Sequence, residues 1–294
     1  MKKSIFLILS LLVYISLQAQ TLPDSQINFV SVLSNINETH SQARDISKYD
    51  ILDSAFMTVS YFLNYRQDPQ EKLPQVTSLV LQIGPRYTCC YSSDYRNIDS
   101  ILLNAVENNR LPPPAFVYTV PVGEVYRNLE TGEMNVLHRM PWEKHYVVYY
   151  REASPGFSWQ ITEDTATVAG YLCRKATASF RGRTWNSWFT TDIPANAGPW
   201  KFQGLPGLIL KAEDSERDFT FTCYAIEQKQ TPIVRYRWDY QKMSPEAWKK
   251  LEKSYHFTPY FHFSRGGTYI FFTRGIPGKQ LDVSWQIFYN PIER

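Results

Sequence analysis

The chain has 294 residues, of which 44% are hydrophobic, 15% aromatic and 20% charged. This composition supplies ample material for a packed core and excludes a disordered or collagen-like chain. Lys and Arg number 31 against 28 Asp and Glu, and two of the lysines are Lys2 and Lys3 in the first segment. The remainder is nearly neutral, whereas a protein that binds nucleic acid needs a clear basic surplus. We therefore expect no nucleic-acid partner.

The first 19 residues have the pattern of a secretory signal peptide. Two lysines form a positive start, an apolar run follows from Ile5 to Leu17, and Ala19 is a small residue suited to signal peptidase. The apolar run is shorter than the ~20 residues of a membrane span and ends in polar side chains. We predict cleavage between Ala19 and Gln20 and no membrane span in the mature chain. The predicted location is the periplasm, the cell envelope or the extracellular space.

After an arm at residues 20–48 that we expect to be irregular, the pattern becomes that of strands. From Ser54 to Asn64 most alternate residues are apolar, and this two-residue period is typical of a strand with one buried face. The buried face is predicted to carry Ala55, Met57, Val59, Tyr61 and Leu63. Further strands are expected at residues 76–83, 86–91, 117–126, 134–139, 146–151, 167–181, 184–191, 208–213, 218–226, 269–273 and 283–289.

Two segments have helical spacing instead. In residues 95–108 apolar side chains recur every three or four positions, and Ser93 or Asp94 can cap the first turn. A second helix is predicted over residues 244–254, with Ser244 as the N-cap and Pro245 at the first helical position.

Strands that do not alternate with helices argue against a doubly wound α/β fold. We predict a mainly β fold: a single antiparallel, strongly curved sheet, or a partly open barrel or sandwich, with about two short helices. Residues 49–294 are expected to form one domain, since no glycine-rich linker divides them.

Four cysteines follow the signal segment: Cys89, Cys90, Cys173 and Cys223. In an oxidising compartment they allow three full pairings, and the sequence does not choose among them. A bond between adjacent cysteines is strained, so bridges to Cys173 or Cys223 are geometrically easier. The spacing lacks the CxxC pattern of a zinc site, so we predict at least one structural disulfide and no metal. The alternative for each cysteine is a small buried hydrophobic side chain.

Residues 198–210 read GPWKFQGLPGLIL. The segment from Leu205 to Leu208 has the sequence of a type II turn, in which Pro206 fixes φ and Gly207 supplies a positive φ. One interpretation is a rigid corner, with Gly204, Pro206 and Gly207 as structural turn residues and two aromatic side chains packed against it. The other is a recognition surface on a fixed loop. Its binding residues would be Trp200, Lys201, Phe202, Leu205 and Pro206.

This segment resembles the signature of the GLPGLI family of exported Bacteroidetes proteins, which residues 204–209 spell out. Residues 170–176 (GYLCRKA), 184–194 (TWNSWFTTDIP) and 289–293 (YNPIE) are similar to further segments of that family. The resemblance implies export, a β-rich fold and a place in the cell envelope beside outer-membrane uptake or secretion systems. It implies no particular activity.

The sequence contains no G-x-S-x-G, H-E-x-x-H, Walker A or dinucleotide-binding motif, so we predict no catalytic residues and no cofactor. Four acidic residues, Glu213, Asp214, Glu216 and Asp218, are expected at a solvated hairpin tip, with Ca²⁺ binding as the alternative. The predicted function is that of a non-enzymatic binding or accessory protein, whose partner is an envelope protein, a peptide or an apolar ligand. The alternative is an exported hydrolase, or a thiol- or metal-dependent enzyme, assembled from distant residues.

The cleavage site gives a direct test. We expect the protein recovered from the periplasm of an expressing bacterium to begin at Gln20, because Ala19 is the small residue that precedes the cut. Intact-mass measurement checks this, and a mass that retains residues 1–19 would contradict it.

Overall fold

The computed structural model describes residues 29–30, 44–110, 120–139, 147–257, 271–272 and 289–294. The predicted signal peptide and most of the strands expected at 269–273 and 283–289 lie outside these residues. The strands are β1 (Phe29–Val30), β2 (Tyr49–Ala55), β3 (Met57–Tyr65), β4 (Gln75–Ile83), β5 (Tyr87–Ser92), β6 (Glu124–Asn128), β7 (Glu133–Arg139), β8 (Val147–Ala153), β9 (Gln160–Val168), β10 (Tyr171–Phe180), β11 (Arg183–Thr190), β12 (Leu208–Asp214), β13 (Phe219–Glu227), β14 (Thr231–Tyr236), β15 (Tyr240–Lys242) and β16 (Phe271–Phe272). The helices of the described part are α3 (Ser93–Glu107) and α4 (Pro245–Phe257).

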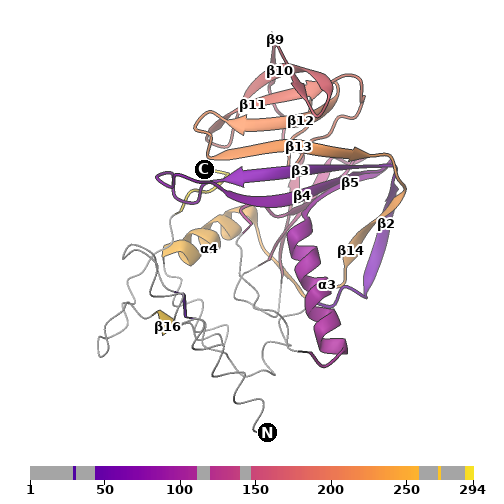
Figure 1. Cartoon of the computed structure of the whole chain (residues 1–294), viewed down its shortest axis with the longest axis vertical. Coiled ribbons are helices and arrows are strands. Elements are labelled where there is room, and N and C mark those ends of the chain that lie inside the picture. Colours follow the sequence, from indigo (N-terminus) through magenta and orange to yellow (C-terminus); the bar gives the residue numbers. More distant parts are fainter. Residues whose placement is uncertain (1–28, 31–43, 111–119, 140–146, 258–270, 273–288) are drawn as a thin grey trace.

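Twelve strands form one mixed sheet in the order β15-β8-β7-β6-β5-β4-β3-β13-β12-β11-β10-β9. Figure 1 shows the part of this sheet from β5 to β9. Neighbours run antiparallel, apart from β15, which pairs parallel to β8. The edge strands β9 and β15 do not pair with each other, so the sheet is not closed. Strands β2 and β14 form a separate two-stranded sheet, and β1 pairs with β16.

The mainly β class is confirmed, but the prediction of a single antiparallel sheet is wrong. The chain leaves the large sheet at β13 to form β14 against β2, and then returns to the far edge of the large sheet. It arrives there in the same direction as β8, and the Val147 N–H donates to the Asp239 carbonyl at 2.8 Å. Such a return path depends on contacts between distant residues and leaves no local pattern in the sequence.

The sheet curves so strongly that strands near its opposite ends meet. Arg181 in the β10–β11 turn lies 2.6 Å from the carboxylate of Glu152 on β8, although eight strands separate β8 from β10 in the sheet. Buried side chains of strands from β3 to β13 then share one core on the concave side. The two-residue period of β3 is confirmed, because its five odd-numbered residues are buried and the residues between them are not.

Two hairpins are made by turns whose central residues both have positive φ, which is the geometry that matches strand twist. Arg181 and Gly182 (φ 44° and 78°) connect β10 to β11, as the sequence predicts. Ala169 and Gly170 (φ 49° and 85°) connect β9 to β10. The prediction of one strand over 167–181 is therefore wrong, since the Ala-Gly pair was not recognised as a turn.

The helices start at hydroxyl caps. The Ser244 hydroxyl accepts the Ala247 N–H at 3.1 Å, which confirms the predicted cap of α4. At α3 the cap is Ser92, whose hydroxyl accepts the Tyr95 N–H at 3.4 Å. The predicted cap Asp94 instead accepts hydrogen bonds from Thr77 and Ser78, and so connects α3 to β4.

Within the described part of the chain, no helix has the length and apolar character needed to cross a membrane.

Residues 198–210, which we call the signature segment, fill the concave side of the sheet. Trp200 and Phe202 are buried and pack against Trp185 of β11, with ring centroids 5.9 and 4.8 Å away. This arrangement agrees with the interpretation of the segment as a rigid corner.

The predicted type II turn is wrong in its detail. Gly207 does not have a positive φ; the positive values in this segment belong to Gly204 (90°) and Trp200 (53°). Gly207 is required for a different reason, because an added Cβ would lie 2.0 Å from the carbonyl oxygen of Thr190. A Cβ added at Gly204 would lie 3.4 Å from the nearest atom, so the space allows a side chain there and only the positive φ of Gly204 disfavours one.

These two glycines should respond differently to alanine. Gly207→Ala is expected to cost about 3 kcal/mol or more, because packed backbone must move. Gly204→Ala should cost about 1 kcal/mol, since only a positive φ is strained. Urea unfolding of the purified variants measures both, and equal losses at the two positions would contradict this assignment.

Candidate functional site

An open groove of about 530 Å³ lies between the chain that follows β11 and three connections between strands. We call it the Arg127 groove. Its lining comes from the β2–β3 junction, the β4–β5 turn, the β6–β7 turn and the loop after β11. The lining residues used below are Phe56, Pro85, Arg127, Leu129, Ser154, residues 193–197 and Gln203.

Two large apolar side chains are exposed on this groove. Phe56 is 48% exposed and Leu129 is 41% exposed. Both are held by main-chain hydrogen bonds: the Phe56 N–H donates to Ile83 at 2.9 Å, and the Leu129 N–H donates to Arg86 at 2.8 Å. The apolar walls therefore belong to fixed positions of the scaffold, which lowers the entropic cost of binding.

Asp53 organises the β4–β5 turn beside the groove. Its carboxylate is buried and accepts the N–H groups of Arg86 (2.7 Å), Tyr87 (2.9 Å) and Ser54 (2.9 Å). Burial alone would raise the pKa of Asp53, but these donors hold it below its usual value. Gly84 is needed at this turn, because a Cβ there would lie 2.5 Å from the Asp53 carboxylate.

Arg127 on β6 is the buried charge that lines the groove. It is 5% exposed, and its guanidinium donates to the carbonyl of Asn196 at 2.6 Å and to the side-chain oxygen of Gln203. Its Nε has no hydrogen-bond partner. No carboxylate of the described residues forms an ion pair with it, and burial lowers its pKa to about 10.

Other buried cations of the described residues are paired. Lys201 of the signature segment is 1% exposed, and its ammonium lies 2.5 Å from Glu152 and also contacts Glu293. Arg181 pairs with the same two carboxylates. Burial alone would raise the pKa of Glu293, but these two cations hold it below its usual value.

The predicted binding residues lie mostly in the interior. Trp200, Lys201, Phe202 and Leu205 are buried, and only Pro206 of the five is exposed. Their predicted role in binding stays a prediction, while the structure gives them packing and ion-pair partners. The sequence analysis did not predict the residues that line the groove. The sequence signal for Phe56 was an apolar side chain outside the two-residue period of β3, whereas no sequence signal pointed to Arg127.

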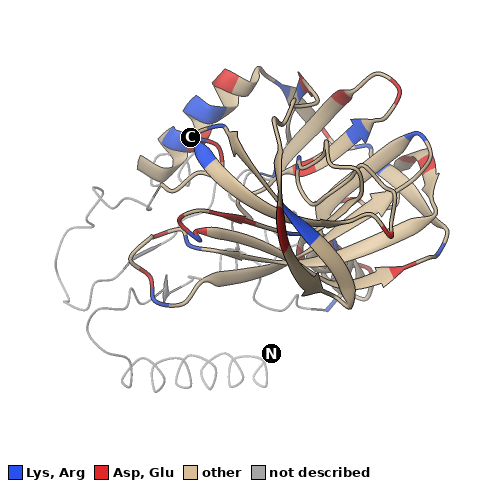
Figure 2. Cartoon of the chain, turned by 90° about the horizontal axis from the view of Figure 1, so that it is seen from above, with Lys and Arg blue, Asp and Glu red and all other residues tan. Residues whose placement is uncertain are grey.

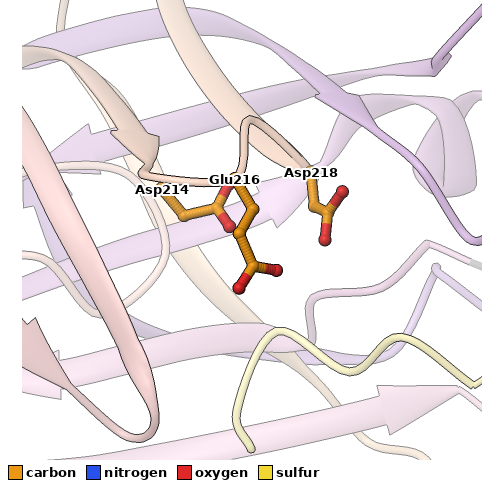
Figure 3. A group of neighbouring side chains, drawn as sticks. All are labelled: Asp214, Glu216 and Asp218. Atoms are coloured by element: carbon orange, nitrogen blue, oxygen red, sulfur yellow. The ribbon is translucent and has the colours of Figure 1, made fainter. Parts of the chain in front are cut away.

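The acidic cluster lies in the β12–β13 turn (Figure 3). One carboxylate oxygen from each of Asp214, Glu216 and Asp218 lies within 4.8 Å of the others. The guanidinium of Arg183 is 2.6 Å from Asp214 and 3.4 Å from Asp218, and Arg294 pairs with Glu216.

The interpretation of this cluster as a solvated tip is wrong for Asp214 and Asp218, which are 1% and 4% exposed. Strand β12 pairs antiparallel with β11, and Arg183 at the start of β11 is buried against both carboxylates. The arrangement is an arginine–carboxylate cluster, in which a guanidinium supplies the positive charge that a metal ion would supply.

All four cysteines are buried free thiols. Burial raises the pKa of Cys89 and Cys90 to about 12, and that of Cys173 and Cys223 to about 11. Thiols with such values are weak nucleophiles near neutral pH. Cys89 packs with the smaller core around Tyr126, whereas the other three belong to the main core, which separates Cys89 from Cys173 and Cys223. The disulfide predicted from the sequence is not formed in the structure and stays a prediction.

A smaller cleft of about 80 Å³ lies between α4 and β7 and is lined by His138, Trp248 and Glu252 among others. The His138 ring stacks on Trp248 with centroids 4.1 Å apart. Burial, together with the charge of Lys201, lowers the pKa of His138 to about 3, so this ring is neutral. Burial raises the pKa of Glu252 to about 7, and its carboxylate accepts the Tyr289 hydroxyl at 3.3 Å.

Comparison with known proteins gives one family resemblance. A family model described as "Protein of unknown function (Porph_ging)" matches residues 181–211. The chain is similar to that family over this stretch. The matched residues run from the β10–β11 turn through the signature segment into β12, and they include residues 204–209. No curated protein matches the chain.

Two solved structures also match, described as "Structure of PNGF-II in P21 space group" and "Structure of PNGF-II in C2 space group". Their TM-scores are 0.48 and 0.47, each with 13% sequence identity over 68% of this chain. The chain spans about a third of the length of those chains (33% and 32%).

The raised pKa of Glu252 predicts a pH dependence of stability. A carboxyl whose folded pKa is raised stabilises the fold fully below about pH 4.5, and that contribution is lost as pH rises through about 7. Glu252→Gln keeps the uncharged form, so at pH 8 it should be about 1–3 kcal/mol more stable than the parent protein, with no gain at pH 4.5.

Urea unfolding at the two pH values measures this difference. Glu246→Gln on the exposed first turn of α4 is the matched control and should give no gain at pH 8. A Glu252→Gln protein that is no more stable at pH 8 would show that this carboxyl is not buried as described.

Proposed function

We propose that the protein is an exported, non-enzymatic binding protein of the GLPGLI family, and that it holds an apolar segment of an envelope partner in the Arg127 groove. The observation that carries this proposal is the pair of exposed apolar side chains, Phe56 and Leu129, on a groove of about 530 Å³. Grooves of this size with apolar walls and a few polar groups are typical ligand sites. Exposed apolar patches commonly mark interaction surfaces.

Export and the family assignment are supported by separate observations. The first 19 residues have the order of charge, apolar run and small residue that a signal peptide requires. The similarity to the Porph_ging family includes the GLPGLI string itself. The segment that carries this string also contributes Gln203 to the groove, beside residues 193–197 of the loop that precedes it.

The surface charge supports a partner other than nucleic acid. Basic and acidic residues are interspersed along the strands of the described part (Figure 2). The whole chain carries a formal net charge of only +3. A phosphate backbone is bound through clustered Lys and Arg, so an apolar or mixed ligand fits this surface better.

The enzymatic alternative has less support. A thiol-dependent mechanism needs a low-pKa cysteine, whereas burial raises the pKa of each of the four thiols. The acidic cluster that a metal-dependent mechanism could use is already paired with Arg183 and Arg294.

A peptide library tests the binding function. Random 12-residue peptides displayed with free C-termini are selected on the mature protein, and the affinities of recovered peptides are measured for the parent protein and two variants. Peptides bound in the groove should lose about 10-fold or more in affinity with the Phe56→Ala/Leu129→Ala double variant. They should bind equally to Leu172→Ala, which removes an exposed apolar side chain (65%) outside the groove.

Both sets of substitutions lie at exposed positions, so thermal melting should show little change in stability. If no recovered peptide distinguishes the double variant from the Leu172→Ala control, the Arg127 groove is not a binding site and the proposal fails.

A further inference from the structure

We propose that the Arg127 groove selects an apolar ligand that carries a carboxylate, and that the guanidinium of Arg127 binds this carboxylate. The inference rests on the proposed function, because it names the ligand chemistry of the same groove. It is carried by an uncompensated buried cation next to exposed apolar walls.

The first step concerns charge. A buried ion without a partner of opposite charge is strongly unfavourable, so buried cations in proteins are normally paired. Arg183, Arg139 and Lys201 follow this rule, each with at least one carboxylate oxygen within 2.6 Å. Arg127 is as deeply buried and has no such partner among the described residues. A bound carboxylate would supply the missing charge.

The second step concerns the donors. A guanidinium has five N–H groups, and the two contacts of Arg127 within the protein are to neutral oxygens, those of Asn196 and Gln203. The Gln203 amide is oriented by its own donor, which binds the carbonyl of Pro155 at 2.9 Å. These contacts hold the guanidinium in place without neutralising it, and they leave Nε without a partner. Arginine binds carboxylates through two parallel N–H groups, and such bonds are short and strong.

The groove lining contains a second polar atom without a partner. The hydroxyl of Ser154, just after β8, is buried and makes no hydrogen bond. Its backbone is fixed, because the Ser154 N–H donates to the carbonyl of Gly132 at 2.7 Å. Unpartnered buried polar groups are rare in folded proteins and call for an explanation. Two of them on one groove are explained together by a polar ligand group.

The third step concerns the rest of the ligand. Phe56, Leu129, Pro85 and Ile193 give the groove apolar walls around this polar site. A ligand that matches both features has an apolar body and one carboxylate. A small organic acid and the C-terminal residue of a peptide share this chemistry, and a peptide end adds an amide that the first lacks.

Isothermal titration on the mature protein at pH 7 tests the inference with three probes. N-acetyl-L-phenylalanine and 3-phenylpropanoate carry the carboxylate, with and without the peptide amide. N-acetyl-L-phenylalaninamide has the same apolar body without the charge. We expect the acetylated acid to bind about 10-fold or more tightly than its amide, because only the acid neutralises Arg127. Tighter binding of the acetylated acid than of 3-phenylpropanoate would identify a peptide C-terminus as the preferred source, and the reverse order a free organic acid.

Variants then assign the preference to one residue. Arg127→Gln should bind the acid and the amide equally, whereas Arg127→Lys should keep part of the preference, since it retains charge without the planar fork. Arg174→Gln, at an exposed arginine outside the groove, should behave as the parent protein. Thermal melting confirms that each variant is folded, and the comparison of acid with amide on the parent protein needs no variant.

Equal binding of acid and amide to the parent protein, or failure of all three probes at millimolar concentration, would overturn the inference. A preference for the acid that survives in Arg127→Gln would overturn it as well. The two proposals are separable: if the probes bind without charge preference and binding is lost in the Phe56→Ala/Leu129→Ala variant, the proposed function stands, because the groove binds ligands, but Arg127 does not select them.

Discussion

The interaction on which this structure depends is a group of four buried and half-buried charges that joins the two ends of the curved sheet. Lys201 and Arg181 each contact both Glu152 and Glu293. These residues come from the signature segment, the β10–β11 turn, β8 and the C-terminal residues of the chain. The quartet joins β8 to the β10–β11 turn across the concave side of the open twelve-stranded sheet, beside the main core. Because the two cations face two anions, their mutual attraction offsets the cost of burial.

The same segment that closes the core also builds the candidate site. Trp200, Lys201 and Phe202 lie inside the protein, and the chain on either side of them lines the groove through residues 193–197 and through Gln203. The surface part is therefore anchored on both sides by buried residues. A loop positioned in this way is rigid enough to present a ligand groove. The signature segment thus has a structural role through its buried aromatic residues and Lys201, and a candidate binding role through Gln203.

Arg127 contrasts with the other buried charges. The quartet, the Arg183 cluster and the Arg139 ion pairs are each neutralised within the chain. In the Arg127 groove a cation is held by neutral oxygens and faces an open space with apolar walls. This difference in pairing distinguishes a site that is complete by itself from one that a ligand can complete.

The sequence by itself determined the features that depend on neighbours along the chain. The alternation in β3, the Arg181–Gly182 hairpin and the Ser244 cap of α4 follow from side chains within a few residues, so their patterns are sufficient to predict them. The mainly β class follows from the number of such strands. The tertiary structure decided which strands are neighbours, that β2 and β14 leave the large sheet, and that Gly207 must lack a side chain because Thr190 approaches it. It also decided that Lys201 is paired and Arg127 is not, because burial and ion pairing depend on residues far apart in the chain, such as Lys201 and Glu293, which are 92 positions apart.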